Sequence, residues 1–293
     1  MNIGFIGLGK MGYLIAANIS KQYKTFVYNR TNNVGLAHSK EFNTVCVNDV
    51  KNIFKECHMV FMCLPTYNEV HIILTDDNLK DSHTKIIVDC TSSEPIFQKN
   101  MCEKLKRHNV KYFDAPVSGG PTKAQLGTLT AMVGGDEEIY PSVKTVMETF
   151  SNPIYVGSIG NGCAIKAVNN IMNVSHLCIA AEGLSTLESM GISKETALSV
   201  INNSSGRSLM TEERFPIHIM EKDYNYGFKL GLMKKDVGIA LNMIQNPKMF
   251  SNIEGLISDS VDLYGVDADY TEVVKPYFNK DNGHMEKTEK DII

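Results

Sequence analysis

The chain has 293 residues and a formal net charge of -4. Hydrophobic residues make up 43% of it and charged residues 21%, which are ordinary values for a globular protein. The length exceeds that at which one hydrophobic core usually stops growing, so we expect two domains. The acidic balance gives no general electrostatic reason to bind nucleic acid or an anionic membrane, and we expect neither as a partner.

The seven cysteines are scattered, with no CxxC pair and no Cys/His zinc spacing. We therefore expect reduced, mostly buried thiols and no metal site. An apolar motif begins at Ile3 without a cationic leader, and no stretch approaches the roughly 20 apolar residues of a membrane span. These features predict a cytoplasmic protein.

The first half of the chain, up to about residue 158, alternates short β-branched runs with amphipathic segments. This alternation is typical of strands and helices in a mostly parallel sheet, so an α/β domain is expected over residues 1–158. The expected strands are Asn2 to Ile6, Thr25 to Asn29, Met59 to Leu64, Lys85 to Asp89, Val110 to Asp114, Leu129 to Val133 and Pro153 to Val156.

The second half, residues 159–293, is expected to be all-helical, because the strand signal ends after Gly157. Cys163 to Met190 carries apolar residues at helical spacing and predicts one long helix. Further helices are expected at Lys194 to Asn202, Leu230 to Met243, and Asn252 to Leu263 with Ser251 as its N-cap. The polar segment 279–293 is expected to be a frayed tail.

A glycine motif lies between the first strand and the first helix, with the sequence Gly7-Leu8-Gly9-Lys10-Met11-Gly12. Gly7 permits a tight turn, Gly9 lets the backbone approach a pyrophosphate, and Gly12 lets the helix pack closely on the strand. Such a motif alone is often just a flexible turn. Its position at the start of a βαβ pattern predicts dinucleotide binding.

The second strand ends in Asn29-Arg30-Thr31, where an NAD-binding protein usually carries Asp or Glu for the ribose hydroxyls. Asn29 removes the charge that would repel a 2'-phosphate, while Arg30 and Thr31 can pair with that phosphate. The alternative is that Arg30 is a solvated loop cation. We expect NADP as the preferred cofactor, with NAD possible.

Two further segments carry candidate chemistry. Asp114 to Gly120 follows a strand and ends in consecutive glycines, so backbone N–H groups and the Ser118 hydroxyl could bind a carboxylate; an ordinary turn is the alternative. Lys166 and Asn170 share one helix face. Burial lowers the pKa of a lysine toward neutrality, which suits a general acid or base, although an isolated pair would more often be a surface lysine near an asparagine.

The segment from Phe228 to Leu241 is amphipathic, with a core stripe of Leu230, Met233, Val237 and Leu241. The solvated face is expected to carry Lys234, Lys235 and Asp236. Their spacing alone assigns none of them a functional role.

Four of these segments, taken in order, resemble the β-hydroxyacid dehydrogenase family, which includes 3-hydroxyisobutyrate dehydrogenase and tartronate semialdehyde reductase. They are the glycine motif, Asp114 to Gly120, the segment with Lys166 and Asn170, and Phe228 to Leu241. The resemblance covers nearly the whole chain and implies an NAD(P)-dependent oxidoreductase that interconverts a small 3-hydroxy acid and its semialdehyde or keto form. It also implies an N-terminal Rossmann domain, a long interdomain helix, an all-helical C-terminal domain, and association into a homodimer or homotetramer.

The resemblance also assigns roles to individual residues. The residues implied in cofactor binding are Gly7, Leu8, Gly9, Met11, Gly12, Asn29, Arg30, Thr31, Leu64, Pro65, Ser92 and Lys235. Those implied in substrate binding are Ser118, Gly119, Gly120 and Asn170, and those implied in catalysis are Lys166 and Asn170.

The substrate remains open at this point. Asn29-Arg30-Thr31 resembles the NADPH-preferring glyoxylate and succinic semialdehyde reductases, whereas Ser118-Gly119-Gly120-Pro121 resembles the hydroxyisobutyrate and tartronate branches. A reductase of imines or other non-acid carbonyls on the same scaffold is one alternative, and a dinucleotide-binding sensor without turnover is another. Lys166 and the Ser118 loop argue against the imine reductase, and Lys166 with Asn170 argues against the sensor.

Overall fold

The computed structural model describes residues 1–278 and falls into two compact units. The first unit combines Met1–Asn170 with Asp236–Gln245, and the second combines Ile171–Lys235 with the chain from Asn246 onward. The tail expected at 279–293 lies outside the described residues. Within them, no helix is long and apolar enough to cross a membrane.

A six-stranded parallel sheet forms the centre of the first unit, in the order β3-β2-β1-β4-β5-β6. Its strands are β1 (Ile3–Ile6), β2 (Thr25–Tyr28), β3 (Val45–Cys46), β4 (Met59–Met62), β5 (Ile86–Asp89) and β6 (Lys111–Asp114). Every residue of β1, β4 and β5 is buried, which requires helices on both faces of the sheet. The strand order reverses between β1 and β4, where proteins of this class bind ligands beyond the carboxyl ends of the strands.

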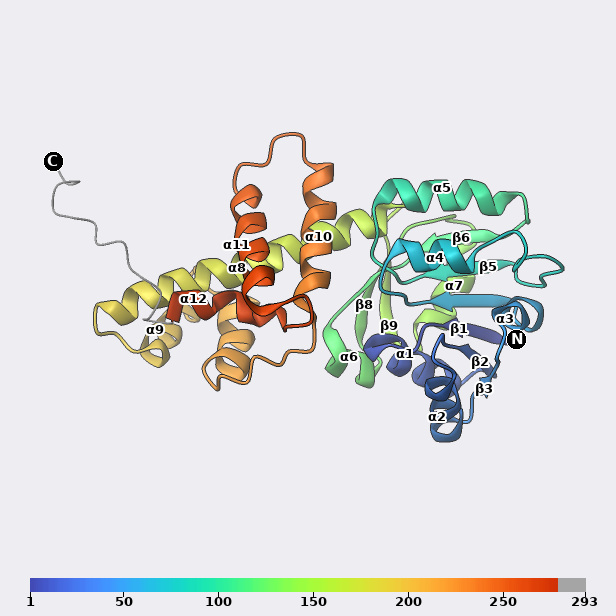
Figure 1. Ribbon diagram of the computed structural model, residues 1–293, viewed down its shortest axis with the longest axis horizontal. Coiled ribbons are helices and arrows are strands. Elements are labelled where there is room, and N and C mark those ends of the chain that lie inside the picture. The colour runs from blue at the N-terminus through green and yellow to red at the C-terminus, as the bar shows by residue number, and fades with distance from the viewer. Residues whose placement is uncertain (279–293) are drawn as a thin grey trace. The chain divides into compact units, whose positions relative to one another are not determined.

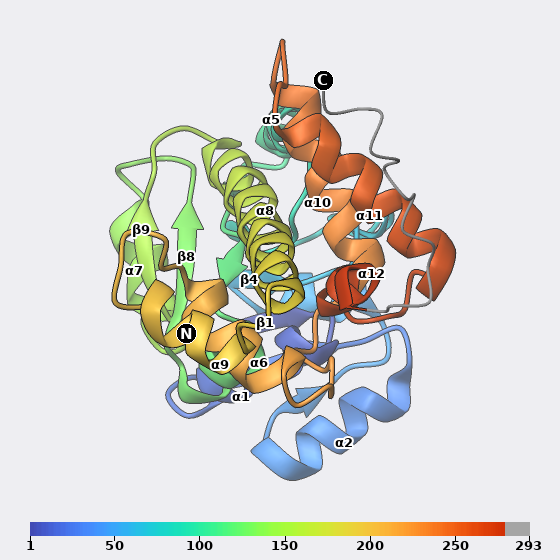
Figure 2. The same cartoon turned by 90° about the vertical axis from the view of Figure 1, so that its left-hand side faces the viewer.

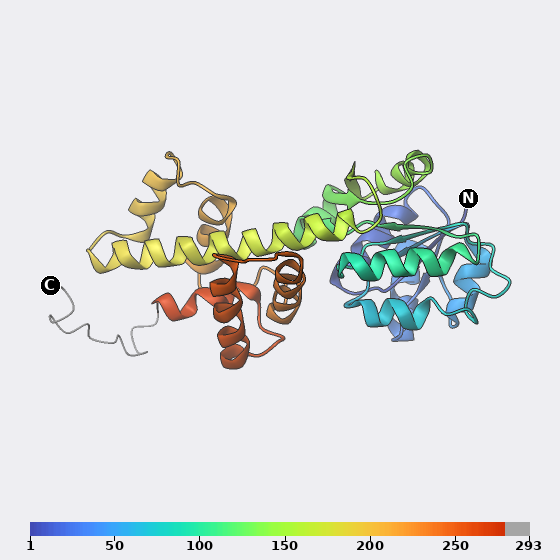
Figure 3. The ribbon, with the colours of Figure 1, turned by 90° about the horizontal axis from the view of Figure 1, so that it is seen from above.

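Helices cover both faces of this sheet. The side chains of α3 (Val50–Glu56), α4 (Tyr67–Ile73) and α5 (Pro95–Lys106) pack on one face, and α4 and α5 lie side by side in Figures 1 and 3. On the opposite face α1 (Lys10–Ser20) packs through Ile15 and Ile19, and α2 (Asn32–Phe42) packs beside α1.

Residues 117–155 form a second sheet, which corrects the expectation that their strands join the main one. β7 (Val117–Ser118) pairs antiparallel with β8 (Leu129–Val133), and β8 pairs parallel with β9 (Ser151–Tyr155). β6 ends before Pro116, which has no N–H to continue its ladder. Helices α6 (Gly120–Leu126) and α7 (Tyr140–Met147) lie between these strands in the chain.

The second unit is helical, as expected. Its helices are the C-terminal part of α8 (Asn161–Ser189), then α9 (Lys194–Ile201), the π-helix η1 (Met210–Ile219), the first residues of α10 (Leu230–Met243), α11 (Phe250–Tyr264), the 3-10 helix η2 (Tyr270–Val274) and α12 (Lys275–Phe278). Figure 2 shows α8 as one unbroken helix. The expectation for Ser251 is wrong: α11 begins at Phe250 with Met249 as N-cap, and Ser251 lies inside its first turn.

Helix α8 carries apolar side chains on its exposed side as well as on its buried side. Ile165, Val168, Met172 and Ile179 are exposed by 38 to 59% of their surface, whereas Ile171, one position away, is fully buried. Periodicity located this helix correctly, but it could not tell which of its apolar stripes is covered.

Candidate active site

The glycine motif forms the turn between β1 and α1. Gly7 has φ +96°, and a Cβ there would lie 2.4 Å from the Cys63 carbonyl oxygen; a Cβ on Gly12 would lie 1.9 Å from the Gly7 carbonyl oxygen. Packing therefore demands glycine at both positions. A Cβ on Gly9 would meet no protein atom within 4 Å, so packing does not require glycine there. Its missing side chain suits a closely approaching ligand at the start of α1.

Asn29 connects the end of β2 to this turn. Its Oδ1 accepts a hydrogen bond from the Leu8 N–H at 3.0 Å, and its Nδ2 donates to the Thr31 carbonyl at 3.1 Å. Arg30 is exposed beside it. The pKa of Glu69 lies below its ordinary value. Burial raises this pKa, but hydrogen bonds from Thr66 and the positive charge of Arg30 lower it by more. Arg30 thus acts electrostatically toward the start of α4, at the same edge of the sheet.

The loops after β4 and β5 are joined by a hydrogen bond from the Leu64 N–H to Thr91 Oγ1 at 3.0 Å. Asp89, the buried last residue of β5, accepts from the Thr91 N–H at 2.9 Å and from the Tyr112 hydroxyl at 2.8 Å. These bonds fix the loop that contains Ser92. Leu64 is half-buried and Pro65 exposed at the surface of the same edge.

Asp236 brings three parts of the chain together. Its Oδ1 accepts a hydrogen bond from the Ser92 hydroxyl at 3.0 Å, and its Oδ2 accepts from Asn170 Nδ2 at 2.6 Å. Asp236 is 2% exposed and Asn170 5% exposed. Lys166, half-buried, lies one helical turn before Asn170 on α8. The structure therefore joins Ser92 to the helix that carries Lys166 through a residue to which sequence reasoning gave no role.

The expectation of a solvated face at Asp236 is wrong. The sequence did contain a signal, because Asp236 lies three residues after Met233 and four before Ala240, both of which are buried. A carboxylate at that spacing falls on the apolar face of the helix, where a buried charge needs hydrogen-bond partners. Leu230, Met233 and Val237 are buried as expected, and Leu241 is half-buried.

Ser118, Gly119 and Gly120 form the connection from β7 to α6. Ser118 pairs with Thr130 of β8, while Gly119 has φ +133° and Gly120 φ +71°. A Cβ on Gly119 would also come within 2.9 Å of two atoms of the Lys123 side chain. The two glycines let the chain reverse direction here and leave the half-buried Ser118 hydroxyl at the turn.

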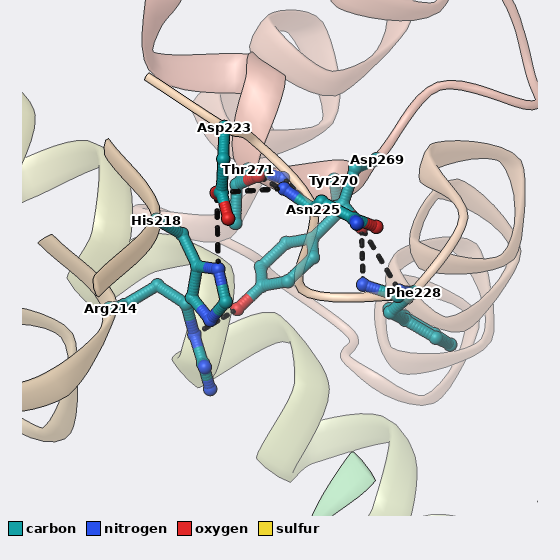
Figure 4. Close-up of polar contacts among 9 residues, drawn as sticks. Arg214, His218, Asp223, Asn225, Phe228, Asp269, Tyr270 and Thr271 are labelled. Carbon is teal, nitrogen blue, oxygen red and sulfur yellow. Dashed lines mark hydrogen bonds and ion pairs between the residues drawn. The ribbon is translucent and has the colours of Figure 1, made fainter. Parts of the chain in front are cut away.

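Lys235 belongs to the second unit, on the first turns of α10. The start of that helix is fixed by Asp269, whose Oδ2 accepts from the N–H groups of Gly227 at 2.6 Å and Phe228 at 3.1 Å. Figure 4 shows this carboxylate beside Tyr270, whose hydroxyl accepts a 3.0 Å hydrogen bond from Nε of the buried Arg214. The described residues contain no group of three or more His, Cys, Asp or Glu side chains placed to hold a metal ion.

Two family descriptions together match residues 2–277 of the chain. Residues 2–160 match the NAD binding domain of 6-phosphogluconate dehydrogenase, and residues 160–277 match the NAD-binding domain of NADP-dependent 3-hydroxyisobutyrate dehydrogenase.

Curated relatives and solved structures agree with these matches. The 2-(hydroxymethyl)glutarate dehydrogenase of Eubacterium barkeri is 33% identical, over 82% of this chain and 81% of its own. A probable mitochondrial 3-hydroxyisobutyrate dehydrogenase of Arabidopsis thaliana is 31% identical, over 82% and 75%. The structure of Mycobacterium tuberculosis 3-hydroxyisobutyrate dehydrogenase with L-serine superposes with a TM-score of 0.86 at 24% identity, covering 94% and 98%.

Imine reductases share the fold at a greater distance. The Myxococcus stipitatus imine reductase with NADP+ has a TM-score of 0.64 at 16% identity, covering 94% of this chain and 99% of its own. With its parallel nucleotide-binding sheet, its helical second unit and relatives above 30% identity, the chain belongs to the β-hydroxyacid dehydrogenase family and is an NAD(P)-dependent oxidoreductase of that family.

Proposed function

We propose that this protein interconverts a small 3-hydroxy acid and its semialdehyde or keto form, with NADP(H) as preferred cofactor and Lys166 as the proton-transferring residue. The observation that carries the proposal is the Ser92–Asp236–Asn170 network, which fixes a carboxamide one turn from Lys166 on the same helix. A scaffold that merely bound a dinucleotide would need no such polar network beside a lysine.

The cofactor would be held by the glycine turn and the end of β2. The open space at Gly9 and the N-terminal end of α1 suit the pyrophosphate. Asn29 presents no negative charge, and the exposed Arg30 and Thr31 are available to a 2'-phosphate, which supports NADP over NAD. Ser92, Leu64 and Pro65 would lie along the nicotinamide half, with Lys235 contributing a cation. The bound cofactor supplies or accepts the hydride.

The substrate would be oriented through its carboxylate and its reacting oxygen. The Ser118 hydroxyl and the backbone N–H groups of Gly119 and Gly120 would bind the carboxylate. Asn170 donates one N–H of its carboxamide to Asp236 at 2.6 Å, and the second N–H would bind the reacting oxygen of the substrate. In reduction, the Lys166 ammonium gives a proton from Nζ to the carbonyl oxygen as it becomes a hydroxyl; in oxidation, neutral Lys166 takes that proton.

The names of the relatives support the substrate class, since they specify dehydrogenases of small hydroxy acids. We propose a small carboxylate-bearing substrate of this class, and a homodimer or homotetramer as the working assembly. All seven cysteines are free thiols, which fits a reducing compartment, and we place the protein in the cytoplasm.

The test is a panel of short hydroxy acids and aldehydes, assayed with NADPH and NADH, for wild type and for Lys166→Ala. On the substrate that wild type uses best, Lys166→Ala should retain NADPH binding and lose at least about 100-fold in kcat, the effect typical of losing a general acid or base. Lys166→Arg should not restore turnover, because a guanidinium stays protonated near neutral pH.

One control variant and three contrary outcomes make this test decisive. Lys144→Ala, on the surface of α7, removes an exposed lysine from a helix without proposed site residues and should leave kcat unchanged. Wild-type turnover by Lys166→Ala would refute the assignment. Reduction of cyclic imines in preference to every carboxylate-bearing carbonyl would favour the imine reductase alternative, and cofactor binding without any turnover would favour a sensor.

A further inference from the structure

Asp114 is a buried carboxylate that holds the beginning of α8. It is the last residue of β6 and is 0% exposed. Its Oδ1 accepts from the Gly160 N–H at 2.7 Å, and its Oδ2 accepts from the Cys163 N–H at 2.7 Å. The first N–H groups of a helix have no partner within the helix itself. Asp114 satisfies such groups from a strand lying 46 or more residues earlier in the chain.

Two glycines make room for this carboxylate. A Cβ on Gly134 would lie 2.5 Å from Asp114 Oδ1. A Cβ on Gly162 would lie 2.9 Å from Asp114 Oδ2 and 2.2 Å from the Met132 carbonyl oxygen. The close approach of α8 to β6 and β8 therefore depends on the absence of side chains on both sides of Asp114.

A buried carboxylate cap costs more desolvation free energy than a cap on the protein surface. Burial raises the pKa of Asp114 to about 6, even though the hydrogen bonds from Gly160 and Cys163 lower it. Among residues 1–278, no Lys, Arg or His lies within ion-pair distance of this carboxylate. A solvated Asp or Ser would cap a helix with less desolvation, so the buried position does something besides capping: it fixes the helix to the strand.

The strand and the helix that Asp114 joins each lead to a proposed site residue. Ser118 follows Asp114 by four residues, and Lys166 follows Cys163 by three. The Asp114 backbone also exchanges two hydrogen bonds with Gly134, at 3.1 and 2.8 Å, which ties β6 to the end of β8, the strand that pairs with Ser118. One residue therefore contacts both the sheet carrying Ser118 and the helix carrying Lys166.

We propose that Asp114 is a positioning residue that sets the spacing between Lys166 and the Ser118 turn, and thereby aligns the proton donor with a substrate held by its carboxylate. This inference rests on the proposed function. Asp114 touches neither substrate nor cofactor. It acts through the first turn of α8, and a small displacement of that turn would move Lys166 while leaving the glycine turn of the cofactor site in place.

The experiment compares Asp114→Asn with wild type. The carboxamide keeps the shape but offers one acceptor oxygen, so its NH2 group would face either the Gly160 or the Cys163 N–H and repel it. We expect kcat to fall about 10- to 100-fold, by analogy with the cost of a 1 Å misplacement, and the dissociation constant of NADPH to stay within about twofold. The kinetic isotope effect with 4-deuterated NADPH should increase, because the chemical step becomes slower relative to product release.

A second variant and a stability control complete the design. Gly162→Ala keeps the carboxylate but pushes α8 away from β6, so it should show the same lowered kcat and increased isotope effect. Val146→Ala, in the core of α7, should lower Tm while leaving kcat and the isotope effect unchanged. If Asp114→Asn does not fold, Gly162→Ala decides the question by the same readouts.

The inference is overturned if the folded variants keep kcat within about twofold of wild type. It is also overturned if kcat falls only in proportion to the folded fraction, with the isotope effect unchanged, because that is the signature of lost stability alone. Lys166→Ala, run in parallel, separates the two proposals. Loss of turnover in Lys166→Ala with normal turnover in Asp114→Asn contradicts only the positioning role, whereas normal turnover in Lys166→Ala contradicts the proposed function.

Discussion

At the end of β2, Asn29 occupies the position at which NAD-binding proteins of this fold usually carry Asp or Glu. Asn29 also stabilises the glycine turn, because its Oδ1 accepts a hydrogen bond from the Leu8 N–H. A carboxylate could accept the same hydrogen bond. Charge at this position can therefore be changed while the contact with Leu8 is kept, at the loss of the hydrogen bond from Nδ2 to the Thr31 carbonyl.

We predict that Asn29→Asp lowers the preference for NADPH over NADH, measured as the ratio of kcat/KM values, by at least about tenfold, since a new negative charge would repel the 2'-phosphate. Asn52→Asp, the same substitution on the exposed surface of α3, should leave the ratio unchanged. Wild-type use of NADH equal to that of NADPH would show that the interpretation of Asn29-Arg30-Thr31 is mistaken.

At the scale of elements, Asp236 shows how a helix from a late part of the chain enters a site built by an early part. α10 supplies the carboxylate, the loop after β5 supplies Ser92, and α8 supplies Asn170. Asp236 accepts a hydrogen bond from each of the other two side chains and thereby orients both.

We predict that Asp236→Asn lowers kcat at least about tenfold, because the amide group can no longer accept from both Ser92 and Asn170 and leaves a buried donor poorly paired. The KM for substrate should change less than kcat if orientation of Asn170 is what fails. Asp259→Asn, on the exposed face of α11, is the matched control and should behave as wild type. Unchanged kcat in a folded Asp236→Asn protein would exclude the orienting role.

How far the sequence predicts these elements depends on the type of signal. The apolar runs of β1, β2, β4, β5 and β6 and the long periodicity of α8 predict these elements correctly, because buried strands and helical spacing leave strong local patterns. The separate sheet of β7, β8 and β9 was not predicted. Its pairing depends on contacts such as that between Asp114 and Gly134, which have no local pattern.

Some residues of the candidate site could likewise be predicted from local sequence patterns, and others could not. The glycine turn could be found from spacing, since local backbone geometry requires glycine at positions 7 and 12. Spacing could place Asp236 on the buried face of α10, but it could not give the partners of Asp236 or of Asp114, which lie 46 to 144 residues away. Such roles become visible only when the distant backbone or side-chain partner is known.

At the scale of the whole molecule, stability should depend on pH through His38, which is 0% exposed. Its Nδ1 lies 2.9 Å from Thr44 Oγ1 and its Nε2 3.0 Å from the Tyr13 carbonyl oxygen, an arrangement that suits a neutral ring donating to Tyr13 and accepting from Thr44. Burial lowers the pKa of His38, partly offset by the bond to Tyr13 and the charge of Glu41. The unfolded chain therefore binds a proton at a higher pH than the folded one.

This difference in proton binding decides how the free energy of unfolding changes with pH. The contribution of His38 to the free energy of unfolding is fully present above the unfolded pKa of about 6.5 and is lost as pH falls below it. Asp114, whose pKa is raised to about 6, acts in the opposite direction between about pH 4 and 6. We predict that urea midpoints measured at pH 7.5 and 5.5 differ by less in His38→Gln than in wild type. An equal difference in both proteins would exclude His38 as the titrating group.

The first unit is discontinuous in sequence, since it needs Asp236–Gln245 as well as Met1–Asn170. Asn170 and Asp236 are 66 residues apart, so at about 5–20 residues per second a ribosome makes the second about 3 to 13 seconds after the first. During that interval the nascent nucleotide-binding sheet can form, but Ser92 and Asn170 lack the carboxylate that joins them. A nascent chain halted before α10 could therefore bind the dinucleotide at its glycine turn before it could carry out any chemistry.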